Sequence, residues 1–239
     1  MISLDNYINS VIDENLSSLE EYILAYKSDT SLTSSTIGEI IANSITHGIG
    51  VGLSVAGLVL LIIRAVKLGT GWHLAGFLVF GISLLLLYTS STIYHSFANK
   101  PWKGIFQRLD HAMIYFLIAG TYTPYLLIVS RTTLGWTIFG IIWGLSVVGL
   151  ILKFVFVKRF EKPTVWLYLL MGWAGMVVFF QARTELSTLS VLFLVLGGIC
   201  YTAGLVFYKW EKLPYAHAIW HLFVLGGSIF HYFSIMQLV

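Results

Sequence analysis

Seven stretches of apolar residues, each about as long as a membrane-crossing helix, follow one another from residue 44 to the end of the sequence. A helix needs roughly 20 predominantly apolar residues to cross the hydrocarbon core of a bilayer. The pattern therefore predicts an all-α integral membrane protein, a seven-transmembrane helix bundle. The predicted spans are 44–64, 73–96, 111–130, 134–156, 164–181, 188–208 and 216–238.

The third predicted span contains a proline, Pro124, in the stretch AGTYTP. Proline lacks a backbone N–H, and its ring clashes with the preceding turn of a helix. We therefore expect the third span to kink or to unwind locally at this residue.

The first 36 residues follow a different pattern. Between Ile8 and Leu24, apolar residues recur at spacings of three and four, which indicates an amphipathic helix. This segment holds six of the eleven acidic residues and one basic residue, Lys27. Its acidic start and the lack of an apolar core argue against a secretory signal peptide. We expect an acidic amphipathic cytoplasmic segment at 1–36 and a seven-transmembrane domain at 37–239.

Composition supports a membrane protein of the multi-pass type. The chain is 57% hydrophobic and 10% charged, which leaves too few charges for the surface of a soluble fold. Its net charge of +3 is too small to indicate nucleic-acid binding, and its single cysteine, Cys200, excludes a disulfide framework within one chain. We expect the protein in the cell (plasma or inner) membrane. The sequence leaves the oligomeric state open.

The basic residues predict an orientation, because cytoplasmic loops of membrane proteins carry an excess of lysine and arginine. With the amino terminus inside, ten of the fourteen basic residues fall on the inner side. The remaining four, Arg64, Lys67, Arg131 and Arg183, fall on the outer side. We therefore predict a cytoplasmic amino terminus and, with seven spans, an external carboxyl terminus.

Unusual polar residues gather at the ends of four spans, and the seven-span threading puts these ends on one side of the membrane. They are Glu39, Asn43, His47, Ser91, His95, Asp110, His111, His217 and His221. Residues four apart lie on the same face of a helix, which aligns several of these side chains. Polar side chains are costly in hydrocarbon and usually have a partner or a function.

Each residue also has a simple structural interpretation when it is taken alone. Asp110 can cap a helix, Ser91 can bond to backbone, and His95 can be solvated at the interface. His217 and His221 can bond to neighbouring carbonyls. Their gathering at one depth and on one side favours a functional site over these separate interpretations.

Three histidines suit zinc, which accepts neutral imidazole nitrogen. With His95, His217 and His221 as ligands, the fourth tetrahedral position stays open for water, as in a catalytic site. Asp110 can orient a ligand histidine or accept a proton from that water. The Ser91 hydroxyl can bond the water or a substrate carbonyl, or it can act as a nucleophile.

The other histidines fit a shared ion less well. His47 lies on the same side of the membrane, and we favour packing and hydrogen bonding over a role as a spare ligand. His111 points roughly 100° away from its neighbour Asp110 on a helix. His231 lies roughly 15 Å further along its helix than the last candidate ligand. His73 begins the second span on the opposite side, where we expect an interfacial residue.

Four motifs resemble those of the hemolysin III family. They are EIIANSITH at Glu39–His47, SxxxH at Ser91–His95, RLDHAMIYFLIAGTYTP at Arg108–Pro124 and HxxWH at His217–His221. This family is the bacterial branch of the progestin and adipoQ receptor (PAQR) group, which is related to the alkaline ceramidases. The resemblance covers about residues 36 to 239 and does not include the acidic segment.

The resemblance implies a seven-helix bundle with a zinc site that faces the cytoplasm. Carried over by motif, the ligands are His95, His217 and His221, with Ser91 and Asp110 beside the bound water. Related eukaryotic members are thought to hydrolyse the amide bond of ceramides at this site. The family name comes from the haemolytic behaviour of some members.

These observations lead to three hypotheses about function. The first is a zinc-dependent hydrolase that cleaves an amide or ester of a membrane lipid, which enters sideways between helices. The second is a cytolysin with pore-forming or membrane-disturbing activity, although a secreted toxin must survive in water and we expect neither a soluble form nor a signal peptide for this chain. The third is a non-catalytic membrane receptor or regulator that contains zinc.

Overall fold

The computed structural model describes Leu16 and residues 36–97, 102–155, 161–175, 185–210 and 212–239. The chain divides into two units, Met1–Gly38 and Glu39–Val239, and the second contains the candidate site. Apart from Leu16 and Thr36, the acidic segment expected at 1–36 lies outside the described residues. The amphipathic helix and the domain division at residue 36 therefore stay predictions.

All the secondary-structure elements in the described part of the chain are helices. The elements are α2 (Ile37–Leu68), α3 (Gly71–Ser96), α4 (Lys103–Pro124), η1 (Tyr125–Val129), α5 (Thr133–Val155), α6 (Glu161–Trp173), α8 (Thr188–Tyr208) and α9 (Ala216–Met236). Within this part of the chain, six helices are long and apolar enough to cross a membrane, with α4 and η1 counted together. These six agree with six of the predicted spans, and the protein is a multi-pass membrane protein.

The remaining predicted span, 164–181, is described only in part. Its first half coincides with α6, an apolar helix too short to cross a bilayer within the described residues. Residues 176–181 lie outside the described part of the chain. A seventh crossing therefore stays a prediction, as do the internal amino terminus and the external carboxyl terminus.

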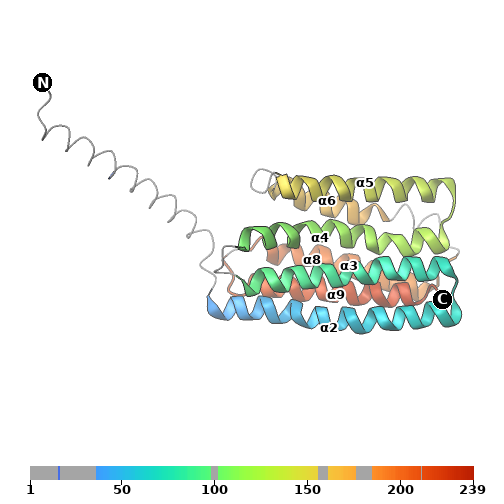
Figure 1. Cartoon of the computed structure of the whole chain (residues 1–239), viewed down its shortest axis with the longest axis horizontal. Helices are drawn as coiled ribbons and strands as arrows, with labels where there is room; N and C mark the ends of the chain where they lie inside the picture. The colour runs from blue at the N-terminus through green and yellow to red at the C-terminus, as the bar shows by residue number, and fades with distance from the viewer. Residues whose placement is uncertain (1–15, 17–35, 98–101, 156–160, 176–184, 211) are drawn as a thin grey trace, which may run out of the picture. The chain divides into compact units, whose positions relative to one another are not determined.

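The long helices run roughly alongside one another (Figure 1). α8 packs against α9, α3 packs against α4, and α4 also packs against α5. α6 contacts both α4 and α8. Close approach of α3 and α4 depends on Gly120, because a Cβ atom there would lie 2.3 Å from Ser83 Oγ.

α2 has a polar inner face and an apolar outer face. Asn43 and His47 are buried, whereas Ile41, Ile45 and Ile49 on the opposite face are about half exposed. This is the reverse of the arrangement in a soluble protein. It suits a helix whose outer face contacts lipid, because apolar side chains are at no disadvantage there.

The expected distortion at Pro124 is confirmed. α4 ends at Pro124, and the chain continues through one π-helical turn, η1. The Ser130 N–H donates to the Tyr125 carbonyl at 3.0 Å, a bond of the i to i+5 type. The proline thus shifts the hydrogen-bond register without ending the helical segment.

Two helices begin earlier than predicted. α2 begins at Ile37 instead of residue 44, and α4 begins at Lys103 instead of residue 111. The polar residues of these first turns lie inside helices, and Asp110 is only 4% exposed although its side chain is polar. The interpretation of Asp110 as a helix cap is therefore wrong, because it lies two turns inside α4.

Candidate functional site

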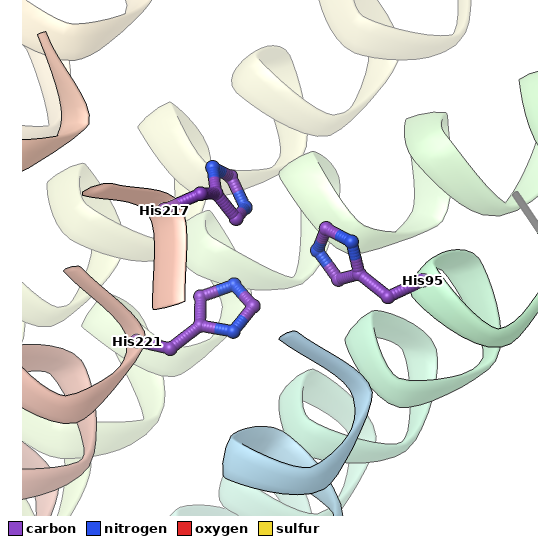
Figure 2. Close-up of side chains that lie close together, drawn as sticks. All are labelled: His95, His217 and His221. Atoms are coloured by element: carbon purple, nitrogen blue, oxygen red, sulfur yellow. The ribbon is translucent and has the colours of Figure 1, made fainter. Parts of the chain in front are cut away.

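His95, near the end of α3, and His217 and His221, in the first turns of α9, form one compact group, here called the three-histidine cluster. The ring centroids lie 4.6 to 4.9 Å apart. One ring nitrogen from each histidine lies within 4.8 Å of the other two. Figure 2 shows the three rings turned toward one another across a common space.

The imidazole Nε2 atoms of this cluster can serve as ligands of a metal ion. The Nε2 atoms of all three histidines are buried and make no hydrogen bond within the described part of the chain. A buried polar atom without a partner is costly, and an unprotonated imidazole nitrogen is a metal ligand. Three such atoms aimed at one space can therefore hold a metal ion.

α2 holds the ring of His221 in this orientation. His221 Nδ1 lies 3.2 Å from the Asn43 carbonyl oxygen and 3.1 Å from Thr46 Oγ1. Because the carbonyl only accepts, Nδ1 carries the hydrogen and donates to it. The Thr46 hydroxyl donates to the Ala42 carbonyl at 2.8 Å and remains an acceptor. Nε2 of His221 therefore keeps its lone pair, an arrangement common around metal-binding histidines.

His47 packs directly on the cluster. Its ring stacks on His221 with centroids 3.5 Å apart and an interplanar angle of 14°. Tyr88 makes a T-shaped contact with the His47 ring, with ring centroids 5.0 Å apart. The expected packing is present, but neither ring nitrogen of His47 has a hydrogen-bond partner among the described residues. The expected hydrogen bonding is therefore not observed.

Ser91 and Asp110 lie next to each other near the cluster. Ser91 is one turn before His95 on α3. Both are buried, with exposures of 0% and 4%. The Ser91 hydroxyl is close enough to Asp110 to interact with its carboxyl group. Ser91 Oγ has no hydrogen-bond partner of standard geometry within the described residues, so the backbone-bonded interpretation lacks support. The catalytic roles expected for the two residues stay predictions.

A cavity of about 210 Å³ begins beside the cluster and continues between α4, α6, α8 and α9. At the cluster end it is lined by Asp110 and by Trp220, whose ring lies 4.9 Å from that of His217. At the other end it reaches Tyr125 and His231. Leucine, isoleucine and valine side chains line most of the length between the two ends.

The two histidines expected to stand apart from the cluster do so. His73 accepts a hydrogen bond from the Thr70 backbone at Nδ1 and bonds the Leu238 carbonyl through Nε2, so it holds the start of α3. His231 bonds the Leu194 carbonyl through Nε2 at 3.2 Å. Neither contributes a nitrogen to the three-histidine cluster.

Sequence reasoning missed the contributions of Thr46 and Lys153. Thr46 lies three residues after Asn43, so helical spacing alone would have placed it on the same face of α2. Lys153 was counted only among the basic residues of the inner side. It is 5% exposed and lines the cavity beside Asp110 and His111, a placement that depends on how α5 packs on α4.

These observations define a class: a multi-pass helical membrane protein with a buried cluster of three histidines at one end of its bundle. Comparison with known proteins specifies it further. The chain belongs to the haemolysin-III related family, whose model matches residues 37–232. This confirms the resemblance inferred from the four motifs.

Named relatives cover most of the chain. It is 49% identical over 201 residues to a protein named Hemolysin-3 homolog from Bacillus subtilis (strain 168), which is 84% of this chain and 94% of the relative. It is 48% identical over 200 residues to Hemolysin-3 from Bacillus cereus, covering 84% and 91%. The human protein named monocyte to macrophage differentiation factor is 30% identical over 165 residues, covering 66% and 68%.

Proposed function

We propose that this protein is a zinc-dependent hydrolase that cleaves an amide or ester bond of a membrane lipid. One observation carries the proposal: three buried, unpartnered imidazole nitrogens stand beside an apolar cavity inside a membrane protein. The first feature suits a metal and the second suits an acyl chain.

His95, His217 and His221 are the residues that would hold the ion. Three neutral imidazoles are a donor set typical of catalytic zinc, which leaves one tetrahedral position open. Zinc bound in this way supplies a Lewis acid that polarises a carbonyl group and makes a water molecule more acidic. The hydrogen bond from His221 Nδ1 to the Asn43 carbonyl fixes that ring for the task.

The dimensions of the cavity support a lipid substrate. Its lining extends from Asp110 in α4 to Tyr125 in η1, a separation of fifteen residues, which corresponds to about 22 Å of helix. That length exceeds half of a hydrocarbon core of about 30 Å. An acyl chain can therefore lie along the cavity with its carbonyl group at the end near the three-histidine cluster.

Asp110 and Ser91 are the residues available for proton transfer and positioning. Asp110 accepts a proton from the attacking water and passes it to the leaving nitrogen or oxygen. The Ser91 hydroxyl, which lies beside Asp110 and makes no hydrogen bond of standard geometry in the described residues, can donate to the substrate carbonyl. Both side chains are buried, so bulk water does not compete for these bonds.

The metal proposal is tested by zinc analysis of purified protein. We expect about one zinc per chain in wild type and a content far below that in His217→Ala. Thermal stability should fall with the metal, because a ligand stabilises the state that binds it. His73→Ala, at the opposite end of α3, is the matched control and should keep its zinc. Full zinc occupancy in His217→Ala would show that the ligands are other residues.

The hydrolase proposal is tested by the lipids of cells that produce each form. Wild type should lower one class of acyl lipid and raise its free fatty acid, and His217→Ala should do neither. Identical lipid profiles for the two forms, together with normal zinc content in wild type, would remove the support for hydrolysis. The metal would then serve a receptor or structural role.

The names of the two Bacillus relatives favour a second candidate, which is cytolysis. Haemolysis by cells that produce wild type, His217→Ala and His73→Ala distinguishes the candidates. Lysis that persists in His217→Ala at equal protein level does not depend on the three-histidine cluster. Lysis lost together with zinc and hydrolysis would make it a consequence of lipid cleavage.

A further inference from the structure

One wall of the apolar cavity contains a buried lysine. Lys153 lies in the last turn of α5, is 5% exposed and lines the cavity. Charged side chains within membrane helices are costly and usually mark a substrate or ion site. An acyl chain alone makes no use of an ammonium group, so Lys153 calls for a separate account.

Hydrogen bonds between α4 and α5 fix the depth of this lysine. Ser146 on α5 donates to the Tyr115 carbonyl on α4 at 2.9 Å, and Arg108 on α4 donates to the Phe154 carbonyl at 3.3 Å. The two helices are antiparallel in this register, so Lys153 lies level with the residues just after Arg108. It therefore stands at the cluster end of the cavity.

The side chains around Lys153 at this end are rich in hydrogen-bond donors. His111 lines the cavity with Lys153 and lies near enough to both Lys153 and His217 to feel their charges. Tyr168 and Tyr208 line the same end of the cavity. The Tyr168 hydroxyl donates to the His111 carbonyl at 2.7 Å, which ties α6 to α4 here. This end of the cavity thus combines a cation with several polar groups.

We propose that Lys153, with His111 beside it, forms a subsite for the oxyanion of an acyl lipid whose chain occupies the cavity. The oxyanion is a phosphate or a carboxylate. Lysine binds such groups as a point charge with three donors. This inference rests on the proposed function and assigns its substrate class: acyl lipids with a negative group near the bond that is cleaved. The same subsite accepts the carboxylate of a released fatty acid.

The test compares pairs of lipids with the same alkyl chain, of which one member carries an anionic group, and none has an amide or ester bond to an acyl chain. Native mass spectrometry in a neutral detergent measures binding of 1-O-hexadecylglycerol 3-phosphate and of its neutral partner, 1-O-hexadecylglycerol. Palmitate and 1-hexadecanol form a second pair that represents the product. Wild type should prefer the charged member of a pair by roughly tenfold or more, since hydrogen bonds to charged groups are the strong ones.

Variants then assign the preference to the lysine. Lys153→Met should bring binding of the charged and neutral lipids close to parity, whereas Lys153→Arg keeps the cation and should keep the preference. Lys209→Met is the matched control: Lys209 is exposed at the end of α8 and lies over the Trp166 ring. A preference for the phosphate lipid assigns the subsite to a headgroup, and a preference confined to palmitate assigns it to the fatty acid.

Two results would overturn the inference. One is equal binding of charged and neutral lipids by wild type, which needs no variant to fold. The other is full preference retained in Lys153→Met. Because ether lipids and fatty acids undergo no cleavage, these readouts do not depend on turnover. Normal zinc content and hydrolysis without a charge preference would leave the proposed function standing and remove only the subsite.

Discussion

Several polar atoms around the three-histidine cluster are buried and make no hydrogen bond within the described part of the chain. They include the cluster Nε2 atoms and Ser91 Oγ. Most buried polar groups in folded proteins have a partner, so each such atom is either costly or reserved for a ligand. The adjacent Ser90, whose hydroxyl donates to the Leu87 carbonyl at 2.9 Å, shows the ordinary arrangement.

The two neighbouring serines make a matched pair for mutation. Ser91→Ala removes a buried hydroxyl that makes no hydrogen bond of standard geometry among the described residues, so thermal stability should change by about 1 kcal/mol at most. Hydrolysis should fall because the substrate carbonyl loses a donor. Ser90→Ala should leave hydrolysis unchanged. A Ser91→Ala protein that is less stable and equally active would identify Ser91 as a structural residue.

Asp110 separates metal binding from chemistry. Asp110→Asn keeps the shape of the side chain and removes both the charge and the base. We expect most of the zinc to remain and hydrolysis to fall by roughly 10- to 100-fold or more, as is usual when a residue behind the ligands is lost. Zinc analysis and lipid profiles of the same preparations measure the two effects. Loss of zinc as complete as in His95→Ala would make Asp110 a direct ligand.

At the level of single residues, the sequence predicts much of the candidate site. His217 and His221 are four apart on an apolar span, so their shared face follows from helical geometry. That His95 meets them follows from threading of the spans. The stack of His47 on His221 could not be predicted, because it depends on the angle between α2 and α9. The unpartnered state of Ser91 likewise depends on packing.

α2 acts as a frame for the start of α9. One face of α2 contacts α9 at Glu39, at the Asn43 carbonyl, at Thr46 and at His47. The first contact is with Tyr215, which directly precedes α9 and has a φ of 58°, in the left-handed region. The Tyr215 N–H donates to Glu39 Oε1 at 3.1 Å. Glu39 thus stabilises the turn that precedes the two α9 histidines.

The contact between Glu39 and Tyr215 predicts the effect of one substitution and its reversal by a second. Glu39→Gln weakens a charge-assisted hydrogen bond at the strained turn and should lower zinc affinity several-fold in a chelator competition. Tyr215→Gly should restore affinity in the Glu39→Gln background, because glycine adopts the left-handed conformation without strain. The Tyr215 side chain is 46% exposed, so its loss removes little packing. Unchanged zinc affinity in Glu39→Gln would show that Glu39 does not position the cluster.

The sequence predicts helices better than helix starts. Apolar length identifies six membrane-crossing helices, but it excludes the polar first turns of α2 and α4. Those turns contain Glu39 and Asn43 in α2 and Asp110 in α4. Their polar groups face other helices instead of water, which a hydropathy pattern cannot indicate. The site residues are thus the reason that the boundaries were misplaced.

On the scale of the whole molecule, the cavity is the feature that the sequence does not predict. Several helices far apart in the sequence contribute to it, and a leucine or valine that lines it resembles one that faces lipid. The position of Lys153 in the cavity wall could not be predicted from the sequence either, because only the register between α4 and α5 brings this lysine to the cluster end. In contrast, the side of the membrane on which each helix ends is predicted by the order of the spans.

The three-histidine cluster itself bears on the seventh crossing. His95 ends α3 and His217 begins α9, and their ring centroids lie 4.9 Å apart, so these two ends share one side of the membrane. α4 begins on that side, and an even number of crossings must then precede α9. The helices α4 with η1, α5 and α8 are each long enough to cross, which gives three. We therefore predict that the segment between α5 and α8, which contains α6, provides the fourth.

Reporter fusions after Lys103, Arg131, Lys162 and Arg183 test this threading together with the orientation. With the amino terminus inside, as the ten-to-four distribution of basic residues predicts, they should report inside, outside, inside and outside. The reverse alternation would keep the seven spans and move the three-histidine cluster to the outer side. The same side at Lys162 and Arg183 would mean that the segment starting with α6 does not cross. His217 would then enter the membrane opposite His95, and a shared zinc ion would be impossible.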